Sequence, residues 1–163
     1  MEVTVTIKRL DLIRMNFLLA PKLKANWITL AMLWVVSLTT YFFLRGMPSY
    51  FDAFIFVAIF TIFMTVLFFP LFLLFCVMLQ AFFANERSGL GIHLYRVQTE
   101  GLYEESPVNI TLFKWRGIER VWRFKNYTFV QVSLTTFHIL PKRDFESEQA
   151  FDAFSEQIEK HMA

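Results

Sequence analysis

Histidines and paired carboxylates are the side chains of this sequence best suited to proton transfer or metal binding. The three histidines, His93, His138 and His161, have no cysteine, second histidine or carboxylate at the spacing of metal ligands, so no metal site is expected. Glu104 and Glu105 are adjacent and would point to opposite faces of a strand, where they could not cooperate as acid and base.

Nucleophilic and phosphate-binding motifs are also missing from the sequence. Cys76 is the only cysteine and lies in an apolar run, which is typical of a small buried hydrophobic residue. The Gly89-Leu90-Gly91 segment lacks the remaining elements of a phosphate-binding loop, and there is no nucleophile elbow. We therefore expect a protein that is not an enzyme and that uses no cofactor.

Basic residues near two predicted turns form the one cluster that indicates binding. One turn follows Pro141 and the other is a hairpin at Asn126. The candidate contact residues are Arg120, Arg123, Lys125, Lys142 and Arg143. If the two turns meet, these side chains could contact anionic lipid headgroups or an acidic partner. The alternative is a solvated, charge-balanced surface, because Asp144, Glu146 and Glu148 follow directly.

Composition places these residues in the flanks of a membrane protein. Hydrophobic residues make up 56% of the 163 residues, charged residues 18%, and there are 21 Phe. From Ala25 to Phe83 only Arg45 and Asp52 are charged. This distribution excludes a disordered chain and a disulfide-stabilised secreted domain. The net charge of +2 supplies no basic face, so nucleic acid is not an expected partner.

Two apolar runs predict a transmembrane helical hairpin over residues 25–83. As helices, residues 25–44 would span roughly 30 Å, the thickness of a bilayer core, and residues 51–83 roughly 50 Å. The loop at 45–50 is too short for anything but antiparallel neighbours. Pro70 predicts a kink in the second run, with a re-entrant break into two short segments as the alternative. The spans carry no carboxylate, Lys, Arg or His at membrane depth, which argues against a stand-alone transporter.

Basic residues near the ends of the spans predict the orientation. The first 24 residues carry five Lys and Arg, the loop carries Arg45 alone, and Arg87 and Arg96 follow the second span. The positive-inside rule then places both termini in the cytoplasm.

The polar flanks predict a strand-rich domain. Residues 1–24 combine an alternating strand over 2–8 with a short amphipathic helix over 10–17. Residues 84–163 form the cytoplasmic domain, in which we expect five short strands, at 92–98, 109–115, 118–124, 127–134 and 136–140, punctuated by Gly101, Pro107 and Gly117. A closing helix with Ser147 as N-cap carries the apolar stripe Phe151, Phe154, Ile158 and Met162. The expected fold is α+β: a curved antiparallel sheet or partial barrel capped by this C-terminal helix.

The chain resembles the YcxB-like family of small bacterial membrane proteins. The matching residues are Glu100-Gly101-Leu102, Trp115, Ile118, Val121, the segment Ile139-Leu140-Pro141-Lys142-Arg143-Asp144-Phe145, and the helix with Phe151 and Phe154. The resemblance implies a domain similar to pleckstrin-homology (PH) modules and a location in the bacterial inner membrane. It implies no reaction.

Three functions are compatible with these features. The leading one is a non-enzymatic interaction or regulatory module at the cytoplasmic membrane face, which binds a protein, a second copy of itself, or anionic lipid. The alternative is an accessory or assembly subunit of a membrane transport or export complex. An enzyme would require a deep polar pocket with perturbed titratable groups in the C-terminal domain.

Overall fold

The structure is a computed structural model of the chain and describes residues 1–45, 49–85, 89–134 and 136–162. The chain divides into two compact units, one made of Met1–Met15 with Ala81–Ala163 and the other of Asn16–Gln80. The predicted N-terminal segment 1–24 is therefore shared between the units.

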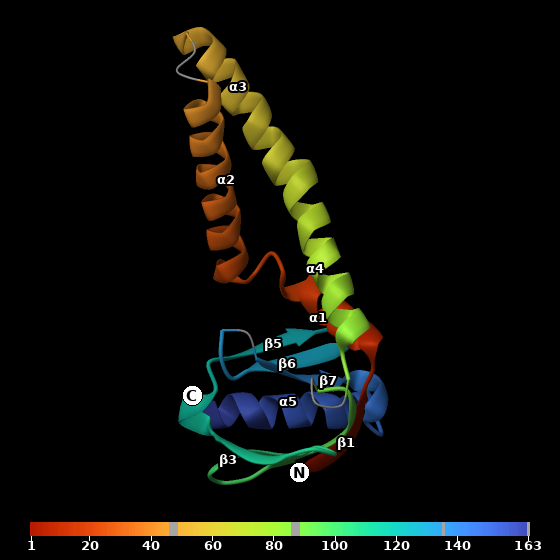
Figure 1. Cartoon of the computed structure of the whole chain (residues 1–163). Helices are drawn as coiled ribbons and strands as arrows, with labels where there is room; N and C mark the ends of the chain where they lie inside the picture. The colour runs from red at the N-terminus through yellow and green to blue at the C-terminus, as the bar shows by residue number, and fades with distance from the viewer. Residues whose placement is uncertain (46–48, 86–88, 135, 163) are drawn as a thin grey trace. The chain divides into compact units, whose positions relative to one another are not determined.

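The first unit contains two antiparallel sheets (Figure 1). The four-stranded sheet has the order β1 (Glu2–Ile7), β2 (Gly91–Val97), β3 (Gly101–Glu105), β4 (Ile110–Lys114). The three-stranded sheet has the order β5 (Arg120–Phe124), β6 (Tyr127–Gln131), β7 (Phe137–Pro141). The helix α5 (Glu148–Met162) lies between the two sheets in Figure 1.

The predicted α+β class with a C-terminal helix is confirmed, but the curved sheet or partial barrel is not what forms. The described strands make two separate sheets. A single turn of 3-10 helix, Trp115–Gly117, ends the run of hairpins after β4, and the chain begins the second sheet at β5. Phe151, Phe154 and Ile158 of the predicted stripe are buried, so this face of α5 fills the interior, whereas Met162 at the end of the stripe is only half-buried. The Ser147 hydroxyl accepts the Ala150 N–H at 3.1 Å, as expected of an N-cap.

The strand β1 pairs with β2 although the whole helical hairpin separates them in sequence. Val5 lies opposite His93, and Val3 opposite Tyr95. Val5 is fully buried, so β1 contributes a side chain to the core although it is an edge strand of the sheet. The hairpin is consequently an insertion between two neighbouring strands.

Gly101 was expected to interrupt the strands, and this prediction is wrong. Gly101 begins β3, a strand that the sequence analysis missed. A Cβ on Gly101 would lie 2.2 Å from the carbonyl oxygen of Phe113 on β4. Glycine is needed here because the backbones of β3 and β4 approach closely, and not because the chain turns.

The second unit contains the two long helices. They are α2 (Lys24–Arg45) and a continuous helix made of α3 (Tyr50–Ile62), the π-helical turn η1 (Phe63–Phe68) and α4 (Phe69–Phe83). The helix α1 (Arg9–Leu19) precedes α2 and is shared between the two units. Its position is close to the predicted one, but the predicted apolar stripe is not its buried face, because Leu10 and Phe17 are exposed and Asp11 is buried. The predicted loop 45–50 falls mainly on residues 46–48, which lie outside the described residues.

Pro70 does not break the second helix. The π-helical turn lies directly before it, and the Phe69 N–H donates to the carbonyl of Met64, five residues earlier. A wider turn at this point accommodates the missing N–H and the bulky ring of proline. The re-entrant alternative is therefore wrong.

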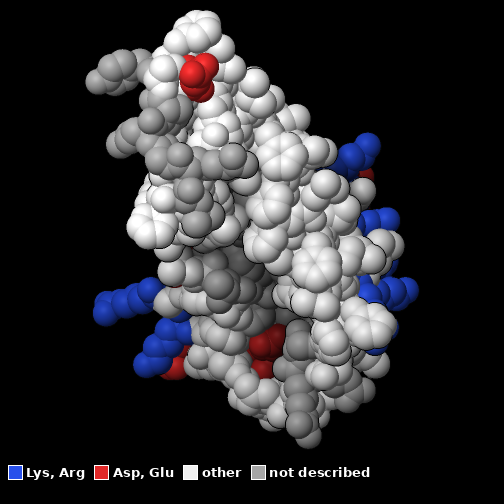
Figure 2. Space-filling model, turned by 45° about the horizontal axis from the view of Figure 1, so that its top comes forward, with Lys and Arg blue, Asp and Glu red and all other residues white. Residues whose placement is uncertain are grey.

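Both long helices have the length and hydropathy of membrane spans, over Lys24–Phe43 and Phe51–Phe83. Only 6% of the most apolar stretch of the first helix and 11% of that of the second are buried inside the protein. The rest of the described chain therefore does not cover their apolar side chains. Figure 2 shows a broad surface of white, uncharged residues, on which one acidic side chain is visible near the top of the view.

Candidate functional site

The five basic residues predicted to contact lipid or a partner lie in two places and do not form one free cluster. Arg120 and Arg123 are on β5, and Lys125 is in the turn before β6. Lys142 and Arg143 are on the 3-10 turn η4 (Lys142–Asp144) that follows β7.

Three of the five basic side chains are paired with acids of the same unit. An Nη of Arg123 donates to Asp152 on α5 at 2.8 Å, and Lys142 pairs with Glu148 at the start of that helix. Arg143 binds Asp11. Among the described residues, Arg120 and Lys125 have no ion pair; both are exposed, and the Arg120 guanidinium lies 4.9 Å from the ring centroid of Trp122.

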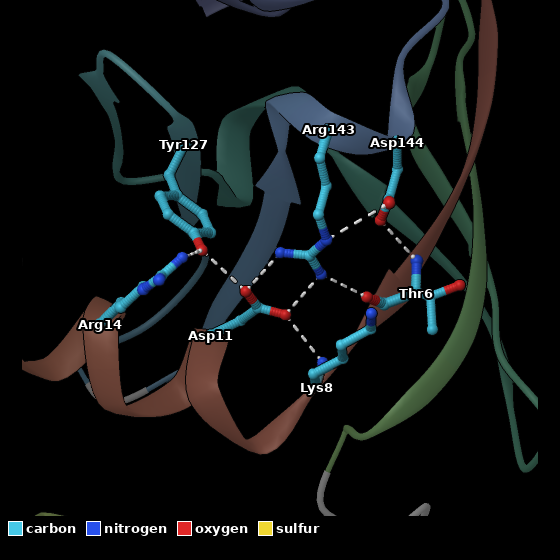
Figure 3. Close-up of polar contacts among 7 residues, drawn as sticks. All are labelled: Thr6, Lys8, Asp11, Arg14, Tyr127, Arg143 and Asp144. Carbon is cyan, nitrogen blue, oxygen red and sulfur yellow. Dashed lines mark hydrogen bonds and ion pairs between the residues drawn. The ribbon is translucent and has the colours of Figure 1, made fainter.

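The pair formed by Asp11 and Arg143 joins several elements of the first unit (Figure 3). Arg143 Nη1 lies 2.7 Å from Asp11 Oδ1, and Nη2 lies 2.7 Å from Oδ2, which is bidentate geometry. Nη2 also donates to the carbonyl of Thr6 at 2.8 Å, and the Thr6 N–H donates to Asp144 at 2.8 Å. These hydrogen bonds therefore connect the turn after β7 to both β1 and α1.

Asp11 has two further donors. The Lys8 N–H donates to Oδ2 and the Tyr127 hydroxyl to Oδ1, each at 2.8 Å. The first bond is the backward half of a capping box, because Lys8 precedes α1 and Asp11 is the third residue of that helix. An Nη of Arg14 donates to the Tyr127 hydroxyl at 2.9 Å, which completes the network in Figure 3.

The charges of this network fit a structural role. Burial of Asp11, which is 1% exposed, would by itself raise the pKa of its carboxyl, but the bonds from Arg143, Lys8 and Tyr127 hold that pKa below its usual value. The carboxylate in turn raises the pKa of Arg143. A fully bonded ion pair of this kind holds elements together, and both its charges are already satisfied.

A second polar cluster lies inside the first unit. His93 and Tyr95 on β2, Glu104 on β3 and His138 on β7 surround one carboxylate oxygen, Glu104 Oε1. Its distances are 2.9 Å to His93 Nδ1, 2.8 Å to the Tyr95 hydroxyl and 3.4 Å to His138 Nδ1. Sequence spacing gave no sign of this cluster, because the pairing of Tyr95 with Glu104 across β2 and β3 is what creates it.

The prediction that Glu104 and Glu105 point to opposite faces is confirmed. The Glu104 side chain is largely buried between the sheets, whereas Glu105 is exposed and accepts the Tyr103 hydroxyl at 3.1 Å. Burial would raise the pKa of Glu104, but the bonds from His138 and His93 lower it well below the usual range. Burial and the neighbouring Glu104 raise the pKa of Tyr95 well above its usual value.

The buried cluster orients its members but offers little chemistry. His93 Nε2 and His138 Nε2 are buried and have no hydrogen-bond partner among the described residues. The described part of the chain contains no group of three His, Cys, Asp or Glu side chains placed to hold a metal ion. His161 lies apart from the cluster and stacks on Trp115 with ring centroids 4.7 Å apart.

Comparison with known proteins supports the resemblance seen in the sequence. Residues 97–158 match the family described as YcxB-like protein, a range that extends from the end of β2 into α5. The match therefore includes Glu104, His138 and Arg143 but not Asp11 or β1. Searches of curated proteins and of solved structures give no match.

Proposed function

We propose that this chain is a bacterial inner-membrane protein that presents a PH-like interaction domain at the cytoplasmic face and acts by binding another protein, without catalysing a reaction. The YcxB-like match over residues 97–158 and the two uncovered apolar helices support the class of protein. Among the described residues, antiparallel strands in sheets of four and three, followed by α5, support a PH-like domain.

The cytoplasmic orientation rests on the distribution of basic residues. Four Lys and Arg precede α2 and Lys24 begins it, whereas Arg45, the last residue of α2, is the only basic residue near the other end of the hairpin. Since β1 and β2 flank the hairpin and pair with each other, both ends of the hairpin must lie on the same side of the membrane.

The outer face of the four-stranded sheet is the observation that favours a protein partner. Ile110 and Leu112 on β4 and Ile92 on β2 are exposed on this face. The strand pairing puts Ile110 beside Glu105, and Leu112 beside Tyr103. Apolar side chains among scattered charges are typical of protein interfaces. Anionic lipid is the weaker candidate, because three of the five basic residues predicted to bind it are neutralised by ion pairs within the domain.

Partner capture tests this proposal. Full-length protein is crosslinked in cells, purified in mild detergent and analysed by mass spectrometry, as wild type and as the double variant Ile110→Asp/Leu112→Asp. The matched control is Leu134→Asp, because Leu134 is 73% exposed but lies between β6 and β7, away from the four-stranded sheet. We expect a reproducible partner, or a second copy, that is lost in the double variant and kept in the control.

Two results would contradict the proposal. Capture that is unchanged in the double variant would show that the outer face of this sheet is not the contact surface. Capture that is lost only when the hairpin is replaced by an unrelated one would instead favour an accessory subunit of a membrane complex. A reporter fused after the last residue tests the orientation, and activity only in an exported form would exclude cytoplasmic termini.

A further inference from the structure

The outward face of α1 carries apolar side chains that the described part of the chain leaves uncovered. Leu10 and Phe17 are each more than half exposed, and they share a face because they lie two helical turns apart. We propose that this face lies on the cytoplasmic surface of the bilayer, with Leu10 and Phe17 inserted at the boundary between headgroups and acyl chains. The inference rests on the membrane location proposed above and concerns α1, not the four-stranded sheet.

The opposite face of α1 packs into the protein. Its buried residues are Asp11, Leu12, Met15 and Leu19. The helix therefore has one inward and one outward face. Asp11 is the only acid of α1, and it lies on the inward face, where Arg143 binds it. The outward face consequently carries no negative charge that would repel lipid phosphates.

The C-terminal end of α1 is held at the start of the first long helix. Only four residues separate α1 from α2. In this connection Asn26 Nδ2 donates to the Ala20 carbonyl at 2.8 Å, and Trp27 Nε1 donates to the Pro21 carbonyl at 3.1 Å. Tryptophan is enriched where a span meets the headgroups. This end of α1 therefore lies at the level where the first span enters the bilayer.

The same helix is also attached to the end of the second long helix. In the first unit, Arg9 Nη2 lies 3.5 Å from the carbonyl oxygen of Ala84, which directly follows α4. In the helical unit, Asn16 Nδ2 donates to Gln80 Oε1, one turn earlier on α4, at 3.2 Å. Because α1 is tied to the ends of both spans, it runs along the membrane surface.

The length of the second span puts these contacts among the headgroups. The stretch Phe51–Phe83 has 33 residues, which is roughly 50 Å of helix. That length exceeds the hydrocarbon core of about 30 Å and is close to the roughly 40–45 Å of a bilayer with its headgroups. The last turns of α4, and α1 with them, therefore lie in the headgroup layer, where amphipathic helices bind membranes.

Continuity with the surface of the spans favours lipid over a protein as what covers this face. The described chain leaves the apolar side chains of both spans uncovered, so lipid surrounds them. The contact between Arg9 and Ala84 brings their neighbours in the sequence, Leu10 and Phe83, to the same region of the first unit. Both neighbours are exposed. Lipid around the end of α4 therefore reaches α1 directly, whereas a protein would have to displace it.

Basic side chains border the apolar face, as they do in helices that lie on anionic membranes. Arg14 lies on the outward face itself, Lys8 precedes the helix and Arg9 begins it; all three are exposed. The Tyr127 hydroxyl to which Arg14 donates is neutral and does not cancel the charge of the guanidinium. These three residues differ from the five basic residues at the sheet turns, and at this depth they would meet lipid phosphates.

Site-directed spin labelling in a bilayer tests the proposal. Cys76→Ser gives a full-length protein without cysteine, into which single cysteines are introduced and labelled with a nitroxide. The protein is reconstituted into phosphatidylethanolamine–phosphatidylglycerol vesicles. Electron paramagnetic resonance then measures how well oxygen and a water-soluble nickel complex reach each label. Oxygen is concentrated in lipid and the nickel complex in water, so the ratio of the two accessibilities reports which of them surrounds the label.

The control position lies at the far end of the four-stranded sheet. Because β2 pairs with β1 in antiparallel fashion, it runs away from α1, and the exposed Thr99 follows it in the turn before β3. We expect the ratio of oxygen to nickel accessibility to be several-fold higher for Leu10→Cys and Phe17→Cys than for Thr99→Cys. Leu71→Cys, on an exposed residue of α4, gives the reference value for a span within the bilayer.

Two results would overturn the proposal and leave the membrane location intact. Labels at positions 10 and 17 that the nickel complex reaches as easily as the label at position 99 would place this face of α1 in water. Labels that neither reagent reaches would show that a protein, such as a second copy, covers the face. A label at position 71 that is itself in water would overturn the membrane location as well, and so separates the two proposals.

Discussion

Removing Arg143 should destabilise the first unit far more than removing an arginine whose ion pair is exposed. In the Arg143→Ala variant, Asp11 stays buried and keeps only its bonds from Lys8 and Tyr127. Breaking a buried pair by deleting one partner typically costs 3–5 kcal/mol. Because the Arg143 side chain is 36% exposed, water can replace part of the lost contact, and we expect a loss of about 2–3 kcal/mol.

Arg96→Ala is the matched control. Arg96 Nε lies 2.7 Å from Glu2 on the same sheet, the same distance as in the buried pair, but both partners are well exposed. Pairs this exposed contribute little to stability, because water screens the charges. Thermal unfolding of the full chain in detergent, followed by tryptophan fluorescence, should show a midpoint about 10 °C lower for Arg143→Ala and little change for Arg96→Ala. Equal shifts in the two variants would refute the argument from burial.

The pH dependence gives an independent check of the same ion pair. The folded-state pKa of Asp11 is lowered relative to its ordinary value of about 3.9. The stabilisation is therefore complete above that pH and is lost as the pH falls toward the lowered folded-state pKa. Asp11→Asn removes this titration, so its unfolding midpoint should fall less steeply below about pH 4 than that of the wild type. Parallel curves would show that Asp11 does not titrate as an ion-paired carboxylate.

Three further variants test the interior of the sheet domain, each by thermal unfolding. Glu104→Gln should lower the free energy of unfolding by about 2–4 kcal/mol, because two buried imidazoles lose their charged partner. Glu105→Gln, at the exposed neighbour, should lower it by less than about 1 kcal/mol. Equal losses in the two variants would contradict the buried cluster. Gly101→Ala should lower the free energy of unfolding by about 1–3 kcal/mol, because the new Cβ clashes with β4. In the control Gly117→Ala the new Cβ meets no atom within 4 Å, so stability should not change. An unchanged stability of Gly101→Ala would contradict the close approach of β3 and β4. Phe154→Ala should cost about 3–5 kcal/mol by leaving a cavity beneath α5, and a cost below about 1 kcal/mol would show that α5 is not the core helix.

Local patterns were sufficient to predict the helices and most strands. The apolar runs predicted both long helices, and the stripe of Phe151, Phe154 and Ile158 predicted the buried face of α5. The alternation of apolar and polar residues predicted β1. These features depend on the period of the residues themselves. Gly101 was misjudged because the sequence shows the glycine but not the strand that approaches it.

Contacts between residues far apart in the sequence could not be predicted, because local patterns carry no information about them. Asp11 and Arg143 are separated by 132 residues, and no spacing rule connects a residue in α1 with one after β7. His93, Glu104 and His138 are likewise brought together by two different sheets. Arg123 and Lys142 pair with acids on α5, and that pairing depends on how the helix packs, which the sequence does not show.

The position of β1 makes the sheet domain dependent on the hairpin that interrupts it. Val5 and Ile7 are buried in the sheet, and burying each such side chain contributes about 1.5–3 kcal/mol. Together with the Asp11–Arg143 pair, the N-terminal segment supplies an amount comparable with the 5–15 kcal/mol that keeps a typical domain folded. The C-terminal residues alone would also leave β2 as an open edge. The sheet can therefore be completed only after the residues of both long helices have been synthesised, which ties folding of the first unit to the hairpin inserted between β1 and β2.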